Sequence, residues 1–225
     1  MYDVRLPNID WLRQRGSLDK FLAADPAAEQ NLIMFYGDSS FTRWAPYRGH
    51  RPLEEDIRRK DGSRAAVNHG FGTSTAEELL YYYDLIVKPW APRALVVQAY
   101  GNDMGAGYSA GEVMFLESRL LDWARHDFPG IRLYLCNKRP LATERPARRK
   151  STDAEYNELV RAYCLRHEDT TLVDHTTCAK LFEEGCQGDY DRPDRTLFVE
   201  DNVHYNQAGY DVYRDFFLQV LDDIL

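Results

Sequence analysis

The sequence predicts an α/β fold, a three-layer α/β/α sandwich built on a central, mainly parallel sheet of five strands. Short apolar runs alternate along the chain with longer amphipathic stretches. This alternation is typical of a parallel sheet with helices on both faces. The apolar runs show little polar alternation, which favours strands that are buried on both sides.

The expected strands occupy residues 32–36, 64–68, 94–100, 131–136 and 171–174. Helices are expected at about residues 75–87, 112–128, 153–167 and 208–225. Ser74 and Glu77 have the spacing of a capping box at the start of the first helix. Each strand is followed by a turn or a helix, so the polar residues after the strands should meet at one edge of the sheet.

The chain of 225 residues fits one main domain. We expect an irregular N-terminal extension at residues 1–30 and a single domain at residues 31–225. The net charge of −8 argues against a general nucleic-acid binder. The first residues lack the apolar core of a signal peptide, and no apolar run approaches the length of a membrane span. These observations predict a cytoplasmic protein.

The four cysteines lack the C-x-x-C spacing of a zinc site, and no histidine pattern supports them. We therefore expect neither a metal nor another cofactor, and small buried thiols explain the cysteines.

Ser39 is the candidate nucleophile, because it stands just past the first expected strand, after Gly37-Asp38. Nucleophilic serine chemistry needs a histidine base held by a carboxylate, and hydrogen-bond donors for an oxyanion. Asp201 and His204 lie three residues apart in the last loop, a spacing that lets the carboxylate hold the imidazole. Asn102 follows the third strand and is a candidate oxyanion donor.

Four blocks of the chain together resemble the SGNH (GDSL-type) hydrolases, a superfamily of serine esterases and lipases. The matching segments are Gly37-Asp38-Ser39 for GDS, residues 68–73 for N-x-G-x-G-G, Asn102-Asp103 for the end of G-x-N-D, and Asp201 with His204 for D-x-x-H. The resemblance spans residues 32–210. It implies a flavodoxin-like sheet, a catalytic domain over residues 31–225 and chemistry without a metal.

The resemblance also implies roles. Ser39 is the nucleophile, His204 the general base and Asp201 the residue that orients it. The oxyanion hole comprises the backbone N–H of Ser39, the backbone N–H of Gly72 or Thr73, and the side-chain amide of Asn102.

The chain departs from the family pattern at two positions. Thr73 stands where the family has a glycine, and Tyr100 stands where G-x-N-D begins with glycine. Both residues add bulk near the site, which favours a small acyl group. We expect four residues to line the pocket: Asp38, His69, Tyr100 and Trp44.

Residues 107–111, GYSAG, match the G-x-S-x-G nucleophile elbow. That motif needs a strand directly before its serine, whereas the third expected strand ends at Tyr100. Ser109 and Glu112 have capping-box spacing, so we expect Ser109 to cap a helix. The basic run of Arg145, Arg148, Arg149 and Lys150 is interpreted as a solvated loop, with a lid that attracts an anionic headgroup as the alternative.

The sequence therefore predicts a serine ester hydrolase acting on a small-molecule ester. An O-acetyl ester of a carbohydrate or similar polar alcohol is the first choice of substrate. A lysophospholipase or an acyl-thioesterase is the alternative within the same class. A non-hydrolytic relative, which binds carbohydrate or transfers acyl groups, is the alternative from another class. The sequence carries no signal for the oligomeric state.

Overall fold

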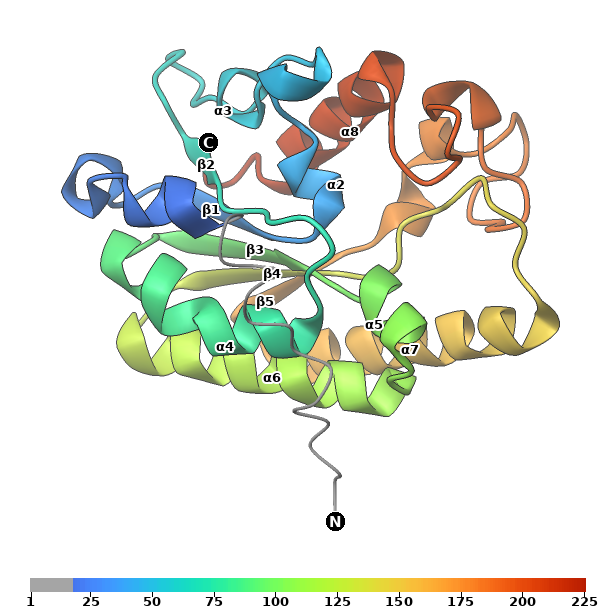
Figure 1. Cartoon of the computed structure of the whole chain (residues 1–225), viewed down its shortest axis with the longest axis horizontal. Helices are drawn as coiled ribbons and strands as arrows, with labels where there is room; N and C mark the ends of the chain where they lie inside the picture. The colour runs from blue at the N-terminus through green and yellow to red at the C-terminus, as the bar shows by residue number, and fades with distance from the viewer. Residues whose placement is uncertain (1–17) are drawn as a thin grey trace.

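A sheet of five parallel strands forms the centre of the computed structural model, which describes residues 18–225 (Figure 1). The strands are β1 (Ile33–Gly37), β2 (Ala66–Asn68), β3 (Ala94–Gln98), β4 (Arg132–Cys136) and β5 (Thr170–Val173). Their order is β2-β1-β3-β4-β5, and every neighbouring pair is parallel. This is the flavodoxin-like order, so the predicted fold is confirmed.

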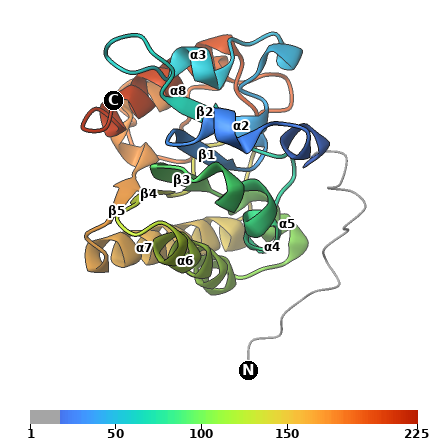
Figure 2. The same ribbon diagram turned by 90° about the vertical axis from the view of Figure 1, so that its left-hand side faces the viewer.

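Helices cover both faces of the sheet (Figures 1 and 2). One layer comprises α4 (Ala76–Ile86), α6 (Ala110–Asp127) and α7 (Ala147–Arg166). The other comprises α2 (Ser39–Thr42), α3 (Leu53–Asp56) and α8 (Gln207–Val220). The short helix α5 (Gly101–Ala106) directly follows β3. The carboxyl ends of the strands share the edge from which α2 and α5 begin.

The core is divided in two by the sheet, because successive residues of a strand point to opposite faces. In β1, Ile33 and Phe35 join the cluster beneath α8, whereas Met34 and Tyr36 join the cluster beneath α4 and α6. All residues of β1 are buried. This two-sided burial explains why the strand is apolar throughout, and it holds the end of β1 rigidly in place.

The structure corrects the cap of α4 by one residue. Thr75, not Ser74, is the N-cap: its Oγ1 accepts a hydrogen bond from the backbone of Glu78, whose carboxylate accepts one from the backbone of Thr75. Ser74 instead uses its carbonyl to accept a hydrogen bond from Asn102. The capping box is therefore formed by the next pair of residues with the same spacing, and Glu77 lies one position off it.

Helix α7 begins earlier than predicted, at Ala147, with Pro146 at its N-cap. The basic run is therefore largely helical rather than a loop. Arginine and lysine favour helices, and proline is tolerated at a helix start because it lacks only a donor that the first turn leaves unpaired. The run thus presents its side chains from a regular element.

Of the predicted N-terminal extension, residues 1–17, including Trp11, lie outside the described residues. Phe21 is buried and packs 4.6 Å from the ring of His69. The boundary at residue 30 between an N-terminal extension and the main domain stays a prediction.

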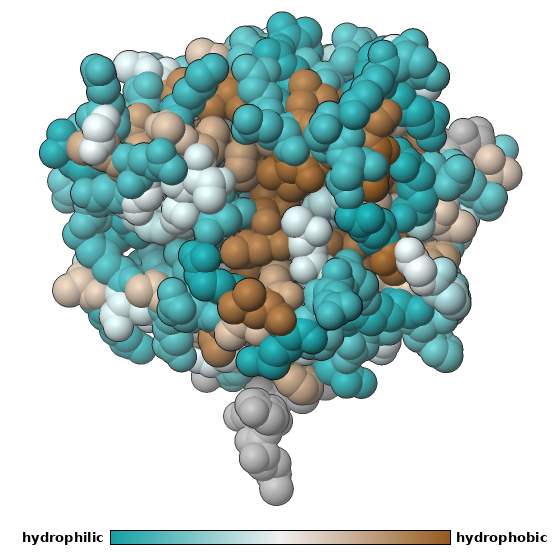
Figure 3. All heavy atoms as spheres, turned by 180° about the vertical axis from the view of Figure 1, so that it is seen from behind, coloured by the Kyte–Doolittle hydropathy of each residue, from teal (hydrophilic) through white to brown (hydrophobic). Residues whose placement is uncertain are grey.

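The face opposite to the one in Figure 1 is mixed in character (Figure 3). Apolar side chains show in the middle of this face, and hydrophilic side chains surround them. Among the described helices, none combines the length and the apolar character needed to cross a membrane.

The loop after β2 passes so close to α2 that only glycine fits at residue 70. A Cβ at Gly70 would lie 2.7 Å from the backbone nitrogen of Thr42 and 2.8 Å from Cβ of Phe41. We expect Gly70→Ala to lower the free energy of unfolding by about 1–3 kcal/mol, measured by denaturant titration, because the backbone must shift. Gly72→Ala is the matched control, since no atom lies within 4 Å of its Cβ position. Equal stability of the two variants would contradict the close approach.

Candidate active site

Ser39 is placed by the end of β1 and the start of α2. Asp38 caps this helix through a hydrogen bond of 2.8 Å from the backbone N–H of Ser40 to its carboxylate. The turn requires glycine before it, because a Cβ at Gly37 would lie 2.4 Å from the carbonyl oxygen of Gln98. Ser39 is therefore the first residue of α2, at the carboxyl edge of the sheet.

The last loop brings a histidine and a carboxylate to Ser39. His204 Nε2 lies 2.8 Å from Ser39 Oγ, and His204 Nδ1 lies 2.6 Å from Asp201 Oδ2. The other oxygen of Asp201 accepts hydrogen bonds from the backbone N–H groups of Val203 and His204, each at 2.9 Å. The turn is thus organised by the same carboxylate that holds the ring. A histidine in this position is able to take the serine proton while the carboxylate stabilises the imidazolium.

The electrostatics of the loop suit a neutral histidine and an ionised carboxylate. Burial lowers the pKa of His204 below its usual 6.5; the nearby charges of Arg139 and Arg43 lower it further, and Asp201 opposes them. Burial opposes ionisation of Asp201, but the hydrogen bonds from His204 and Val203 outweigh it and lower the pKa of Asp201 to about 2. His204 is therefore an available base at neutral pH.

Arg139 ties the start of α2, which carries Ser39, to the last loop. It follows β4, its side chain is buried, and its Nε donates to Ser40 Oγ at 2.8 Å. One of its terminal nitrogens donates to the carbonyl of Val203 at 2.6 Å. Arg139 was not predicted from the sequence, although it stands three residues after the end of β4, and a position just past a strand end is the signal that identified the other candidates.

Asn102 is the second residue of α5, beside the site, and its amide nitrogen donates to the carbonyl of Ser74 at 2.9 Å. The residue before this helix, Tyr100, has a φ of 88°. Such a conformation is an outlier for a bulky residue. It is held by Asp103, whose carboxylate accepts from the backbone N–H of Tyr100 at 2.9 Å and from Ala76 at 2.7 Å. Asp103 thus stabilises the turn.

Gly72 and Thr73 lie in the loop between β2 and α4. Thr73 has a φ of 62°, in the left-handed region that favours glycine. This is consistent with its place at a position where the SGNH pattern has glycine. Neither residue belongs to the wall of the cavity that contains Ser39 and Asn102. The choice between their two N–H groups as an oxyanion donor stays a prediction.

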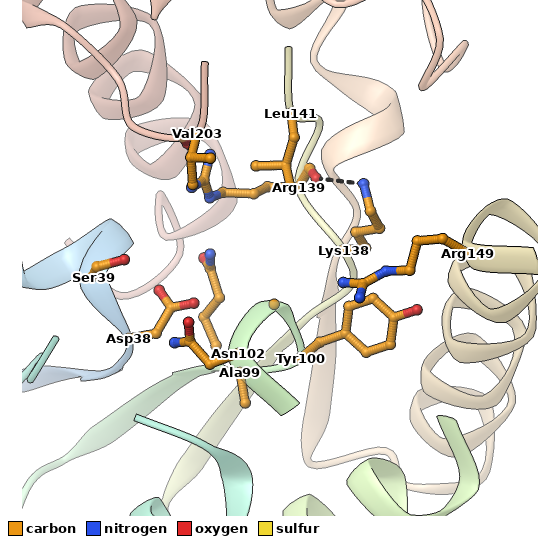
Figure 4. Close-up of a pocket in the computed structure, with 12 residues that line it drawn as sticks. Asp38, Ser39, Ala99, Tyr100, Asn102, Lys138, Arg139, Leu141, Arg149 and Val203 are labelled. Atoms are coloured by element: carbon orange, nitrogen blue, oxygen red, sulfur yellow. Dashed lines mark hydrogen bonds between the residues drawn. The ribbon is translucent and has the colours of Figure 1, made fainter. Parts of the chain in front are cut away.

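A cavity of about 190 Å³ opens beside Ser39 (Figure 4). It is lined by residues from the ends of β1, β3 and β4, from α7 and from the last loop. They are Asp38, Ser39, Gln98, Ala99, Tyr100, Gly101, Asn102, Lys138, Arg139, Leu141, Arg149 and Val203. Asp38 and Tyr100 therefore line the pocket as expected, whereas Lys138 and Arg149 were not among the residues predicted to line it.

Trp44 and His69 do not line the cavity, which corrects the sequence-based expectation. Trp44 is fully buried under α8, and its Nε1 donates to Asp56 at 2.8 Å. His69 Nδ1 lies 2.6 Å from the carbonyl of Ile86, and burial lowers the pKa of His69 to about 4. Trp44 lies close to Ser39 in the sequence, and His69 lies in one of the segments that match the family pattern. The side chains of both residues nevertheless point into the core.

Ser109 is a helix cap and not a nucleophile elbow. It precedes α6, and its Oγ accepts a hydrogen bond from the backbone N–H of Glu112 at 3.2 Å. Helix α5 separates it from β3, so the strand that an elbow requires is absent directly before it. The predicted capping role is confirmed. Within residues 18–225, no group of three or more His, Cys, Asp or Glu side chains is arranged to hold a metal ion.

Comparison with known proteins identifies a family to which the chain is similar. The model of the GDSL-like lipase/acylhydrolase family matches residues 35–212. No curated protein sequence matches the chain significantly.

Solved structures show the same fold. A GDSL-like lipase from Bacteroides thetaiotaomicron VPI-5482 is 17% identical, with 96% of this chain and 98% of that chain covered and a TM-score of 0.68. AlinE4, an SGNH-hydrolase family esterase, is 20% identical, with 88% and 97% covered and a TM-score of 0.58. TesA is 16% identical, with 87% and 100% covered and a TM-score of 0.63.

The contact with His204 should make Ser39 the reactive serine of the chain. We expect phenylmethylsulfonyl fluoride to label the protein at one site, detected as a single adduct by intact-protein mass spectrometry. Ser39→Ala should abolish the adduct, because the other described serines lack a histidine partner. Ser109→Ala should be labelled like the wild type. Loss of the adduct in Ser109→Ala would contradict the assignment.

The rate of this labelling should report the protonation of His204. Because its pKa lies below 6.5, the neutral base predominates above that pH, and the rate should be level there. The rate should fall only as the pH drops through the lowered pKa. Asp201→Asn removes a charge that raises the pKa of His204, so its acidic limb should move to lower pH. A limb centred above pH 7 in the wild type would contradict this electrostatic account.

Proposed function

The chain belongs to the GDSL-like lipase/acylhydrolase family and is a carboxylic ester hydrolase, and from this premise we propose that it removes a small acyl group through an acyl-enzyme on Ser39. The proposed substrate is an O-acetyl ester of a carbohydrate or of a similar polar alcohol. The observation that carries the proposal is the continuous contact from Ser39 through His204 to Asp201.

The reaction proceeds in two steps. Ser39 Oγ attacks the acyl carbonyl while His204 Nε2 takes its proton, and the tetrahedral intermediate expels the alcohol as His204 returns the proton to the leaving oxygen. Water then attacks the acyl-serine, with His204 again as base, and releases the acid and Ser39. Asp201 stabilises the imidazolium in both steps. The N–H of Ser39, the amide of Asn102 and an N–H of Gly72 or Thr73 hold the oxyanion.

The size of the cavity supports a small acyl group. A volume of about 190 Å³ is below the usual range for drug-sized ligands, roughly 300–1,000 Å³. Tyr100 closes one side of it and is rigid, because its hydroxyl donates to Asp153 at 2.7 Å and its ring stacks on Tyr156 at 4.0 Å. A lysophospholipase or a thioesterase for long chains needs a longer apolar groove than this wall leaves.

The contacts at Ser39 also weigh against a relative that only binds carbohydrate. Binding requires neither the 2.8 Å contact between the serine and the histidine nor a carboxylate behind the ring. An acyl transferase uses the same acyl-enzyme with another acceptor, so it differs from a hydrolase only in the product.

An acyl-chain scan tests the proposal. We expect kcat/KM for 4-nitrophenyl acetate to exceed that for the octanoate by at least about tenfold, since the cavity excludes the longer chain. Ser39→Ala should lower kcat on the acetate by about 10⁴-fold or more. Adding glycerol or a sugar should yield acetic acid rather than acetylated acceptor.

A preference for the octanoate would favour the lipid or thioester alternative. Acetylated acceptor as the main product would favour acyl transfer. Activity that survives Ser39→Ala would contradict the mechanism itself.

A further inference from the structure

The cavity beside Ser39 contains more positive than negative charge. Three cationic side chains line it, those of Lys138, Arg139 and Arg149, whereas Asp38 is the one carboxylate among the lining residues. Lys138 and Arg139 are buried. Buried charges are normally paired, so the partners of these three cations decide whether the cavity itself is charged.

Arg139 forms no ion pair with any residue in the range 18–225. Its hydrogen bonds go to neutral acceptors: the hydroxyl of Ser40 and the carbonyls of Pro140 and Val203. These contacts satisfy the guanidinium nitrogens but do not cancel the charge. Asp38, the carboxylate in the same cavity wall, offsets part of this charge without a direct ion pair. The rest of the positive potential of Arg139 is available to whatever enters the cavity.

The other two cations share one buried carboxylate with a third. Asp153 lies 3.0 Å from Arg149 Nε, 3.7 Å from Lys138 Nζ and 2.6 Å from Arg145. Asp153 thus faces three basic side chains. The two arginines are charged, whereas burial lowers the pKa of Lys138 to about 7, so its ammonium is fully protonated only below neutral pH. Arg145 has a further partner in the exposed Asp191, but neither Lys138 nor Arg149 has another carboxylate among the described residues.

Both cations also have unused donors. Lys138 Nζ makes one hydrogen bond within the described residues, 3.0 Å to the carbonyl of Arg139, and lies 4.5 Å from the centre of the Tyr190 ring. An ammonium has three N–H groups, and this side chain is only 4% exposed. The two terminal nitrogens of Arg149 have no hydrogen-bond acceptor between residues 18 and 225, since only Nε bonds Asp153. Figure 4 shows the guanidinium of Arg149 over the ring of Tyr100 and beside Lys138.

We propose that this cavity binds an anionic group of the substrate, a carboxylate or a phosphate, through Arg149 and Lys138, with the charge of Arg139 behind them. The planar guanidinium of Arg149, with its parallel N–H donors, and the compact ammonium of Lys138 suit the oxygens of a carboxylate or a phosphate. The inference rests on the proposed function, because it specifies the substrate of the same site. Since the acyl group proposed there is small, it leaves part of the same cavity free, and the anionic group that reaches Arg149 and Lys138 belongs to the alcohol part of the ester.

Paired substrates test the inference. 4-Acetoxybenzoate and 4-acetoxyphenyl phosphate carry the charge, and methyl 4-acetoxybenzoate is the neutral analogue. Each kcat/KM is divided by the hydroxide-catalysed rate constant of that ester, which removes differences in leaving-group reactivity. We expect the wild type to prefer at least one charged ester over the neutral one by about tenfold or more, as for hydrogen bonds to a charged group. The better of the two charged esters distinguishes carboxylate from phosphate.

Arg149→Met should lower this selectivity ratio by about tenfold, and Arg149→Lys should retain more of it, because the charge remains. Arg148→Met is the matched control: it makes the same change in net charge on the same helix, from an exposed neighbouring position. The ratio should be unchanged in Arg148→Met. An equal fall in both methionine variants would overturn the inference, because it would reflect long-range charge and not the cavity.

A second measurement needs no variant. The alcohol product 4-hydroxybenzoate should inhibit the wild type competitively, with a Ki at least about fivefold below that of 4-hydroxybenzamide, its neutral analogue. Equal inhibition constants would overturn the inference.

The outcomes separate this inference from the proposed function. A selectivity ratio near one, with hydrolysis of the neutral ester that depends on Ser39, would overturn the anion site alone. Absence of Ser39-dependent hydrolysis of every ester would overturn the proposed function and the inference with it. A preference for 4-nitrophenyl hydrogen glutarate over its methyl ester, with none among the acetates, would overturn the placement of the charge on the alcohol.

Discussion

The contact between Ser39 and His204 joins residues that are 165 positions apart in the chain. No local preference creates such a contact. It depends on the parallel sheet, whose strand ends all face one edge, and on a last loop that returns to that edge before α8. The buried β1 fixes one side of the contact, and Asp201 shapes the turn on the other side. Both sides must hold their positions to within a few tenths of an ångström for proton transfer.

Arg139 connects these two sides. A buried guanidinium is costly to desolvate, yet here it bonds the hydroxyl of Ser40 beside Ser39 and the carbonyl of Val203 beside His204. Its charge also lowers the pKa of His204, which keeps the imidazole neutral. One residue therefore contributes to the position and to the protonation state of His204. The same charge, lacking a carboxylate partner among the described residues, faces the cavity.

The sequence predicts the sheet and the main helices because strand burial and helix amphipathicity are local patterns. Ser39, Asp201 and His204 are recognisable for a related reason, since each lies in a short motif, and the structure brings them together. Trp44 and His69 show the limit. A residue beside a motif can point to the cavity or to the core, and only packing against other elements decides which. The cations of the cavity were missed because Lys138 and Arg149 come from different elements, and their meeting depends on where α7 begins.

Residues 138–142, which form the cationic wall of the cavity, are also joined to the last loop, which carries His204. Arg139 bonds Val203, and the backbone N–H of Ala142 donates to the carbonyl of Asn202 at 2.9 Å. The proposed substrate selectivity and the position of His204 are therefore coupled in this chain. We expect a mutation that reshapes residues 138–142 to shift the last loop, and His204 with it. New specificity in this lineage is expected to evolve with an initial loss of rate, and compensating changes should appear in the last loop.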